Sequence, residues 1–142
     1  MTILNPITDQ YQPSMAGTVA ELSEKLLDEL MLSGDSVSIE DTEKSIIDHV
    51  VLYAGWETLH IQKTSSVPVE IDRNISLEVG EWSILEPIVR SHLEYLHAKR
   101  TDGSNAISGE RTGKDPITAY QDYITAKNEL GKLAFCEEVF SV

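Results

Sequence analysis

The sequence predicts a mainly α-helical protein with a small β-sheet or hairpin. We expect about four helices, two of them long and in the C-terminal half, between extended N- and C-terminal arms. Two observations carry this prediction. Apolar residues recur at helical spacing through most of the chain, whereas apolar and polar residues alternate over 56–79. The 142 residues fit a single domain, 1–142, that is long enough to bury a core.

The first element is an N-terminal arm, residues 1–17, which contains Pro6 and Pro13 and shows no clear period. A first helix follows, because Thr18 and Glu21 form a T-x-x-E capping box. Ser33-Gly34 is the expected end of this helix. Its apolar face consists of Val19, Leu22, Leu26 and Leu30.

A second helix is expected from about Ser38 to Gly55. Asp41 and Glu43 place negative charge near its N-terminus, where the helix dipole favours it. The spacing of its apolar residues is helical: Ile39, Ile46, Ile47, Val50 and Ala54. The segment "IIDHVVLYA" is rich in β-branched residues, so a strand is the alternative interpretation.

Residues 56–79 are predicted to form short, half-buried strands. Their apolar residues alternate with polar ones: Leu59, Ile61, Val67, Val69, Ile71, Ile75, Leu77 and Val79. Residues 64–66 and 72–74 are the expected turns. Such a small sheet needs a helix or a neighbouring subunit against one face.

A long helix follows within 81–100, and it contains a proline. Ser83 and Glu86 form a second S-x-x-E pattern. If Ser83 caps the helix, Pro87 lies at the edge of the first turn; if the helix begins at Glu81, Pro87 is interior and should kink it. Trp82 stands at the strand–helix junction, so we expect it to anchor a core or an interface. Pro87 would set the angle at which the helix leaves the sheet. One apolar stripe continues along the helix: Leu85, Ile88, Val89, His92, Leu93 and Leu96.

Residues 101–114 contain three glycines and several polar residues, which predicts a flexible loop. The surrounding stretch is locally basic, with Lys99, Arg100, Arg111 and Lys114 against two acids. This loop is either a solvated surface or a segment near DNA or a partner.

Asp115-Pro116 is a strong helix start. Residues at helical spacing then lead to an expected stop at Gly131: Ile117, Tyr120, Ile124, Lys127 and Leu130. The remaining tail, residues 132–142, is apolar on an otherwise acidic chain, which favours docking on a partner over packing in its own core. Its expected contact residues are Leu133, Phe135, Val139, Phe140 and Val142.

The composition limits the classes of function. With 24 acidic residues against 11 Lys and Arg, the net charge is −13, which disfavours nucleic-acid binding by the surface as a whole. A single cysteine, Cys136, cannot form an internal disulfide framework. No signal peptide or membrane-length apolar run is present, so we expect a soluble protein that is made in the cytoplasm and has no membrane partner.

No pattern indicates catalysis. The four histidines form no H-x-x-x-H pair, so a metal site has no support, and we expect no cofactor and no enzymatic activity. No P-loop, dinucleotide fingerprint or nucleophile elbow occurs. His92 lies on the apolar stripe of its helix, which is typical of a hydrogen-bonded core or interface histidine.

Two segments resemble small head-to-tail connector proteins of tailed bacteriophages. In these proteins a strand leads into an "L-x-x-x-E-W-x-I-x-x-P-L" helix, and the chain ends in "A-F-x-x-x-V-x-V". This chain matches the first pattern at Leu77, Glu81, Trp82, Ile84 and Pro87, with Ile88 in place of Leu. It matches the second at Ala134, Phe135, Val139 and Val142, with Phe140 between them. The resemblance covers roughly residues 75–142 and leaves the loop 101–114 unmatched.

The resemblance implies a structural virion protein at the capsid–tail junction. It would form a homo-oligomeric ring, usually a dodecamer, that joins the portal protein to a neck or tail-completion protein. The ring would continue the DNA channel, and DNA would pass without specific binding. The alternative is a small acidic, non-enzymatic adaptor or regulatory protein of a cellular partner, with its tail as the docking peptide. An enzyme with an unrecognised site is a third possibility.

Overall fold

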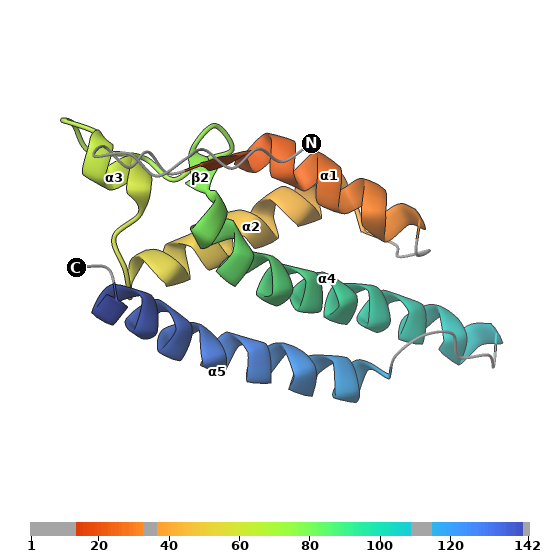
Figure 1. The fold of residues 1–142 in the computed structure, drawn as a ribbon. Helices are drawn as coiled ribbons and strands as arrows, with labels where there is room; N and C mark the ends of the chain where they lie inside the picture. The colour runs from red at the N-terminus through yellow and green to blue at the C-terminus, as the bar shows by residue number, and fades with distance from the viewer. Residues whose placement is uncertain (1–13, 33–36, 109–114, 141–142) are drawn as a thin grey trace.

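The structure, a computed structural model, describes residues 14–32, 37–108 and 115–140. Its elements in chain order are β1 (Met15–Thr18), α1 (Val19–Leu32), α2 (Ile39–Ala54), α3 (His60–Thr64), β2 (Ser76–Glu78), α4 (Val79–Ser108) and α5 (Pro116–Phe140). Figure 1 shows α1 and α5 along opposite edges of the molecule, with α2 and α4 between them. The predicted class is confirmed: the fold is mainly helical, with one small sheet and two long C-terminal helices.

The sheet joins the start of the described chain to its middle. β1 pairs antiparallel with β2, with Gly17 opposite Leu77 and an irregularity between Met15 and Gly17. Gly17 has a φ of +138°, which side chains other than glycine rarely adopt. The last residues of the predicted N-terminal arm, 15–17, are extended and ordered as part of β1. Residues 1–13 lie outside the described part of the chain.

Capping fixes the starts of the first two helices as predicted. The Thr18 hydroxyl accepts a hydrogen bond from the Glu21 amide at 3.2 Å. Ser38 and Asp41 form a reciprocal capping box, with both bonds at 3.1 Å. Such caps satisfy amides that have no partner within their own helix. Gly55 then ends α2, which is helical and not the strand that its β-branched residues also allowed.

Most of the predicted strands in 56–79 are wrong. Residues 60–64 form the short helix α3, and β2 is the only strand among residues 56–79. The alternation of apolar and polar residues has a different cause. Leu59 is buried, and Val69 and Ile71 are half-buried against the core, but none of the three belongs to a strand. Pro68 also lacks the amide that a strand ladder needs.

The core lies between α1, α2, α4 and the sheet. All four predicted apolar positions of α1 are buried, and so are Ile46 and Val50 of α2. Four residues of the predicted α4 stripe are buried, namely Leu85, Ile88, Val89 and Leu93, and Glu81 and Ala98 of the same helix are buried as well. Helical periodicity therefore identified the core faces of these three helices.

α4 begins earlier and ends later than expected. Its first residue is Val79, so Pro87 lies inside the helix, and the Ser83 hydroxyl donates to the Gly80 carbonyl at 2.8 Å instead of capping. Its last residue is Ser108, so the predicted loop 101–114 is wrong over residues 101–108. Extending an existing helix costs far less than starting one, which offsets the poor helix propensity of Gly103. In Figure 1 the last turns of α4 extend past the other elements.

α5 begins at Pro116 as predicted, but Gly131 does not end it. The helix continues to Phe140, so the backbone of the predicted tail, 132–142, is helical through residue 140. The face that packs on the bundle is not the predicted one. It consists of Ala119, Tyr123, Ala126 and Leu130. Of the predicted stripe, only Leu130 is buried, whereas Ile117 is 68% exposed and Tyr120 is 47% exposed.

Within the described residues, no helix combines the length and the apolar character that crossing a membrane requires.

The interior position of Pro87 leads to a testable expectation. Pro87→Ala should raise the free energy of unfolding by about 1–3 kcal/mol, because alanine restores an amide donor to the Ser83 carbonyl and is the better helix former. Urea unfolding followed by circular dichroism measures this. Pro116→Ala is the matched control and should change little, because proline is well tolerated in the first helical turn. A loss of stability in Pro87→Ala would mean that α4 depends on the bend that the proline imposes.

Candidate functional site

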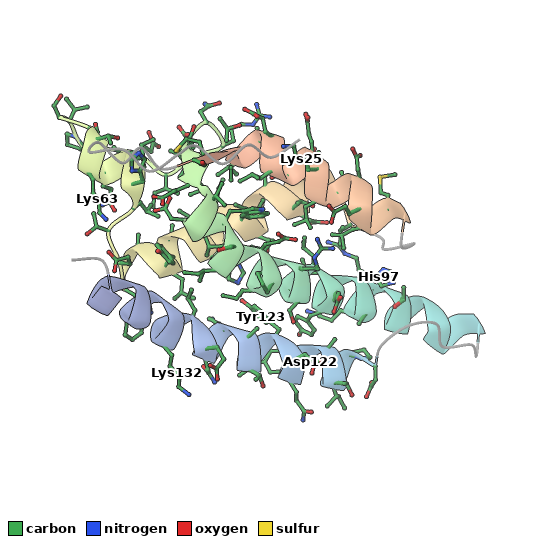
Figure 2. The ribbon with its side chains drawn as sticks, in the orientation of Figure 1. Lys25, Lys63, His97, Asp122, Tyr123 and Lys132 are labelled. Atoms are coloured by element: carbon green, nitrogen blue, oxygen red, sulfur yellow. The ribbon has the colours of Figure 1, made fainter. Side chains whose placement is uncertain are left out.

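Four polar side chains meet where α2, α4 and α5 come together. We call Ser45, His49, His92 and Tyr123 the polar cluster. The Ser45 hydroxyl lies 2.7 Å from His92 Nδ1, and His49 Nε2 lies 2.8 Å from the Tyr123 hydroxyl. Figure 2 shows Tyr123 between α4 and α5. These contacts link residues that are 47 and 74 positions apart in the sequence.

The contacts determine which nitrogen of each neutral ring carries the proton. His49 Nδ1 lies 2.6 Å from the Ser45 carbonyl, which can only accept, so Nδ1 is the donor. His49 Nε2 is then an acceptor for the Tyr123 hydroxyl. His92 Nδ1 is likewise an acceptor, and the Ser45 hydroxyl donates to it. Each of these contacts then joins one donor to one acceptor, so none needs a charged histidine.

Burial keeps both histidines uncharged. It lowers the pKa of His49. Burial, followed by the neighbouring His49 ring, lowers the pKa of His92 to about 4. The two ring centroids are 5.2 Å apart, so a positive charge on both rings would be unfavourable. Burial also raises the pKa of Tyr123, which keeps the phenol as a hydrogen-bond donor.

A serine hydroxyl on a histidine ring is also the geometry of an activated nucleophile. Ser45 is only 1% exposed, so a substrate could reach its hydroxyl only if the helices separated. The hydroxyl lies on α2 and contacts a ring on α4, and the next hydrogen bond leads to α5. The arrangement therefore positions helices and does not present a reactive oxygen to solvent.

Aromatic rings extend the cluster toward the surface. Tyr95 of α4 contacts Tyr120 of α5, with ring centroids 5.1 Å apart, and it stacks on Tyr123 at 6.5 Å. Lys99 Nζ lies 5.5 Å from the centre of the Tyr95 ring. Half-buried and exposed tyrosines thus continue from the polar cluster to an uncovered edge of the α4–α5 pair.

Glu81 is a second buried polar group, 4% exposed. Its carboxylate accepts hydrogen bonds from the His60 and Glu78 amides, both at 2.9 Å. Burial raises the pKa of this carboxyl. Glu81 therefore caps α3 and α4 together and holds the segment between them against the sheet.

Trp82 lies where α4 leaves the sheet, as predicted, whereas Pro87 lies about two turns further along the helix. Trp82 is half-buried against the core and lines a groove of about 100 Å³ between α1 and α4. Arg90 crosses this groove and pairs with Glu29 at 2.5 Å and Glu86 at 2.7 Å. Pro87 is exposed. The groove can hold about one side chain of a partner, and its two described acids are already paired.

The four basic residues of the predicted loop do not lie together in one described loop. Lys99 and Arg100 belong to α4, not to a loop. Arg100 pairs with Asp41 at 2.6 Å, and its guanidinium holds the pKa of Asp41 well below its usual range. Arg100 thus ties α4 to the capping box of α2. Arg111 and Lys114 lie outside the described residues.

The predicted tail contacts are only partly placed. The backbone of Leu133, Phe135, Val139 and Phe140 is helical at the end of α5, and Val142 lies outside the described residues. Sequence reasoning predicted a hydrogen-bonded core or interface role for His92, and this is confirmed. It missed the partners Ser45, His49 and Tyr123. The signal for them was their helical register: each lies on a face that also carries buried residues of the same helix.

Among the described residues, no group of three or more His, Cys, Asp or Glu side chains could hold a metal ion. Comparison with protein-family models, curated proteins and solved structures finds no match to this chain.

The polar cluster makes a prediction about pH. Because the folded chain binds protons on His49 and His92 less readily than the unfolded chain, the stability that these two residues contribute is full above pH 6.5 and is lost as the pH falls towards about 4. For His92 we expect the free energy of unfolding to fall by about 1–2 kcal/mol. This is less than the full difference in pKa between the folded and unfolded chain would give, because the ring is partly exposed. Histidine NMR titration and urea unfolding from pH 7 to 4.5 measure this.

His92→Asn is the informative variant for the same experiment. Asn keeps a polar atom near the position of Nδ1 but does not titrate, so its stability should change less between pH 7 and 4.5. An unchanged slope, or a His92 pKa near 6.5, would contradict the account of the cluster.

Proposed function

We propose that this chain is a structural virion protein, the connector that joins a bacteriophage portal to the tail or neck and continues the DNA channel. In this role it forms a homo-oligomeric ring, of twelve copies by the resemblance, and it has no catalytic activity. Its place is the capsid–tail junction, and its partners are the portal protein, a neck or tail-completion protein and other copies of itself.

The observation that carries this proposal is the uncovered side of α5. This helix is 25 residues long, yet it contacts the rest of the described structure through a narrow face that includes Ala119, Tyr123 and Leu130. Ile117 and Tyr120 are left exposed at 68% and 47%. Large apolar side chains that remain uncovered on a long helix are typical of a subunit that buries them in an assembly.

The residues from Leu77 to Ile84 in the first pattern of the resemblance also occupy one place in the fold. Leu77 is fully buried in β2, Glu81 caps two helices, and Trp82 and Ile84 pack against the core beside them. The pattern therefore describes one junction in which strand and helix are fixed relative to each other. A rigid junction of this kind suits a ring, in which the direction of a long helix sets the spacing of subunits.

Charge supports the channel part of the proposal. Each copy has a formal charge of −13, and the exposed face of α2 carries acids such as Glu40 and Asp48. Surplus negative charge repels phosphates, so DNA would slide past without adhering.

The alternative is a small acidic adaptor or regulatory protein. The groove beside Trp82 and Arg90 could hold one apolar side chain of a peptide from a cellular partner. Such a protein would remain a monomer or dimer. Size-exclusion chromatography with light scattering at high protein concentration, and a test for the chain in purified virions by mass spectrometry, separate the two proposals.

Removing residues 133–142 tests the docking role of the tail. We expect circular dichroism and the melting temperature of the truncated chain to stay near native, because the cut leaves in place the described face of α5 that packs on the bundle, from Ala119 to Leu130. Binding to portal-containing capsids should be lost. Co-sedimentation with capsids measures this, with the full chain carrying Phe135→Ser and Phe140→Ser as the control for side-chain contact. Retained binding would contradict the role of the tail, and unfolding would show that the tail belongs to the core.

The DNA channel leads to a separate expectation. The free protein should not retain duplex DNA at physiological salt, as measured by electrophoretic mobility shift. Lys99→Glu should leave this result unchanged. Tight, salt-sensitive binding that Lys99→Glu weakens would instead identify the basic stretch Lys99–Lys114 as a DNA clamp.

A further inference from the structure

α5 has three faces of different chemistry. One face packs on α2 and α4. A second is polar and consists of Thr118, Gln121, Asp122, Thr125, Asn128 and Glu129. The third, which we call the α5 stripe, consists of Ile117, Tyr120, Ile124 and Lys127. The polar face already provides this helix with a surface suited to water, so solvent exposure alone does not account for the apolar stripe.

The α5 stripe and its neighbourhood are the least acidic part of the chain. Residues 95–127 contain five Lys and Arg against four acids, whereas the rest of the chain contains six against twenty. Lys127 is an exposed residue of the stripe. Lys99 lies over the Tyr95 ring, which contacts Tyr120 of the stripe. An occupant of the stripe should therefore combine negative charge with an apolar contact.

α1 carries such a surface. Its exposed side chains remain net acidic and include Glu21, Glu24, Lys25, Asp28, Glu29 and Met31; we call the row Glu21, Glu24, Asp28 and Met31 the α1 stripe. Met31 is 63% exposed. Glu24 and Asp28 form no ion pair with any described residue. The two stripes repeat with the same spacing of three, four and three residues, and each provides both apolar and charged side chains.

The two stripes lie on different sides of one molecule. α1 packs on α2 and α5 packs on α4, and Figure 1 shows the two helices at opposite edges of the fold. A helix cannot cover the face of another helix across the whole bundle. The stripes can meet only between two copies, and a contact between two different faces repeats from copy to copy and closes into a ring or continues as a filament.

We propose that the α5 stripe of one copy docks antiparallel on the α1 stripe of the next, with Lys127 against the carboxylates of Glu21 and Glu24 and Ile117 against Met31. This inference rests on the proposed function, to which it adds the two faces that join the subunits. Because half of the contact is electrostatic and partly exposed, the association should weaken as salt rises.

Two variants test the contact without disturbing the core. Ile117→Asp alters the α5 stripe and Met31→Asp alters the α1 stripe, and both side chains are more than 60% exposed. Analytical ultracentrifugation of the full chain at low salt should show assemblies larger than a dimer for the wild type. Each variant alone should associate about tenfold more weakly or worse. Gln121→Asp, on the polar face of α5, is the matched control and should assemble as the wild type does.

Mixing the two variants gives the sharpest result. The Ile117→Asp chain keeps an intact α1 stripe, and the Met31→Asp chain keeps an intact α5 stripe, so one contact can form between them. The second contact would bring two introduced aspartates together, so the mixture should stop at dimers. Dimers in the mixture, with monomers in each separate sample, are the expected outcome.

Three outcomes would overturn the inference. Wild-type assembly in both variants would mean that other faces join the subunits. Loss of assembly in Ile117→Asp but not in Met31→Asp would mean that α5 contacts something other than α1, such as a second α5. A wild type that stays monomeric at high concentration would exclude the contact. Co-sedimentation with portal-containing capsids is scored separately, so the connector function can stand or fail independently of these results.

Discussion

The hydrogen bond between His49 and the Tyr123 hydroxyl determines how the last helix sits on the fold. Tyr123 is the largest side chain on the packed face of α5, and its hydroxyl reaches a histidine on α2 across the edge of α4. The small residues Ala119 and Ala126, one turn away on either side, let the helix approach closely enough for this contact. A neutral, fully paired hydrogen bond in a buried place costs little, whereas an unpaired histidine or phenol there would cost about 1–3 kcal/mol. The rotation of α5 about its own axis is therefore set by polar chemistry more than by apolar area.

This rotation has a consequence for function. With Tyr123 turned inward, Ile117 points away from the core, because it lies about a third of a turn away on the same helix, and Tyr120, about a sixth of a turn away, lies at the edge of the packed face against Tyr95. Burying either side chain fully would gain roughly 1.5–3 kcal/mol, so leaving both exposed is a stability cost that a monomer has no reason to retain. An assembled subunit recovers that cost at an interface. The uncovered stripe, the two different edges of the molecule and the resemblance of the β2–α4 junction to phage connectors all support the same proposal.

Local signals in the sequence predicted what local physics decides. The caps at Thr18 and Ser38 and the Asp115-Pro116 start identified three helix boundaries, and apolar spacing identified the core faces of α1 and α4. The strands over 56–79 could not be predicted correctly. Val69 and Ile71 alternate with polar residues as strand residues do, but the segment that they anchor to the core is not a strand. The face of α5 was misassigned for a related reason. Size and hydropathy favoured Ile117 and Tyr120, whereas the structure uses two alanines and a tyrosine whose partner, His49, is 74 residues away. A partner that distant in sequence leaves no local signal, so the polar cluster could be recognised only in its parts.

The central claim is that the α5 stripe is covered by another copy when the protein assembles. Hydroxyl-radical footprinting read by mass spectrometry tests it most directly, because it reports the exposure of individual side chains in the unmodified chain. Tyr120 and Trp56 have similar exposure in the isolated subunit, 47% and 57%. In dilute solution both should be oxidised. In the assembled state Tyr120 should become protected while Trp56, which lies outside both stripes, stays labelled. Equal oxidation of Tyr120 in the dilute and the assembled protein would contradict the claim.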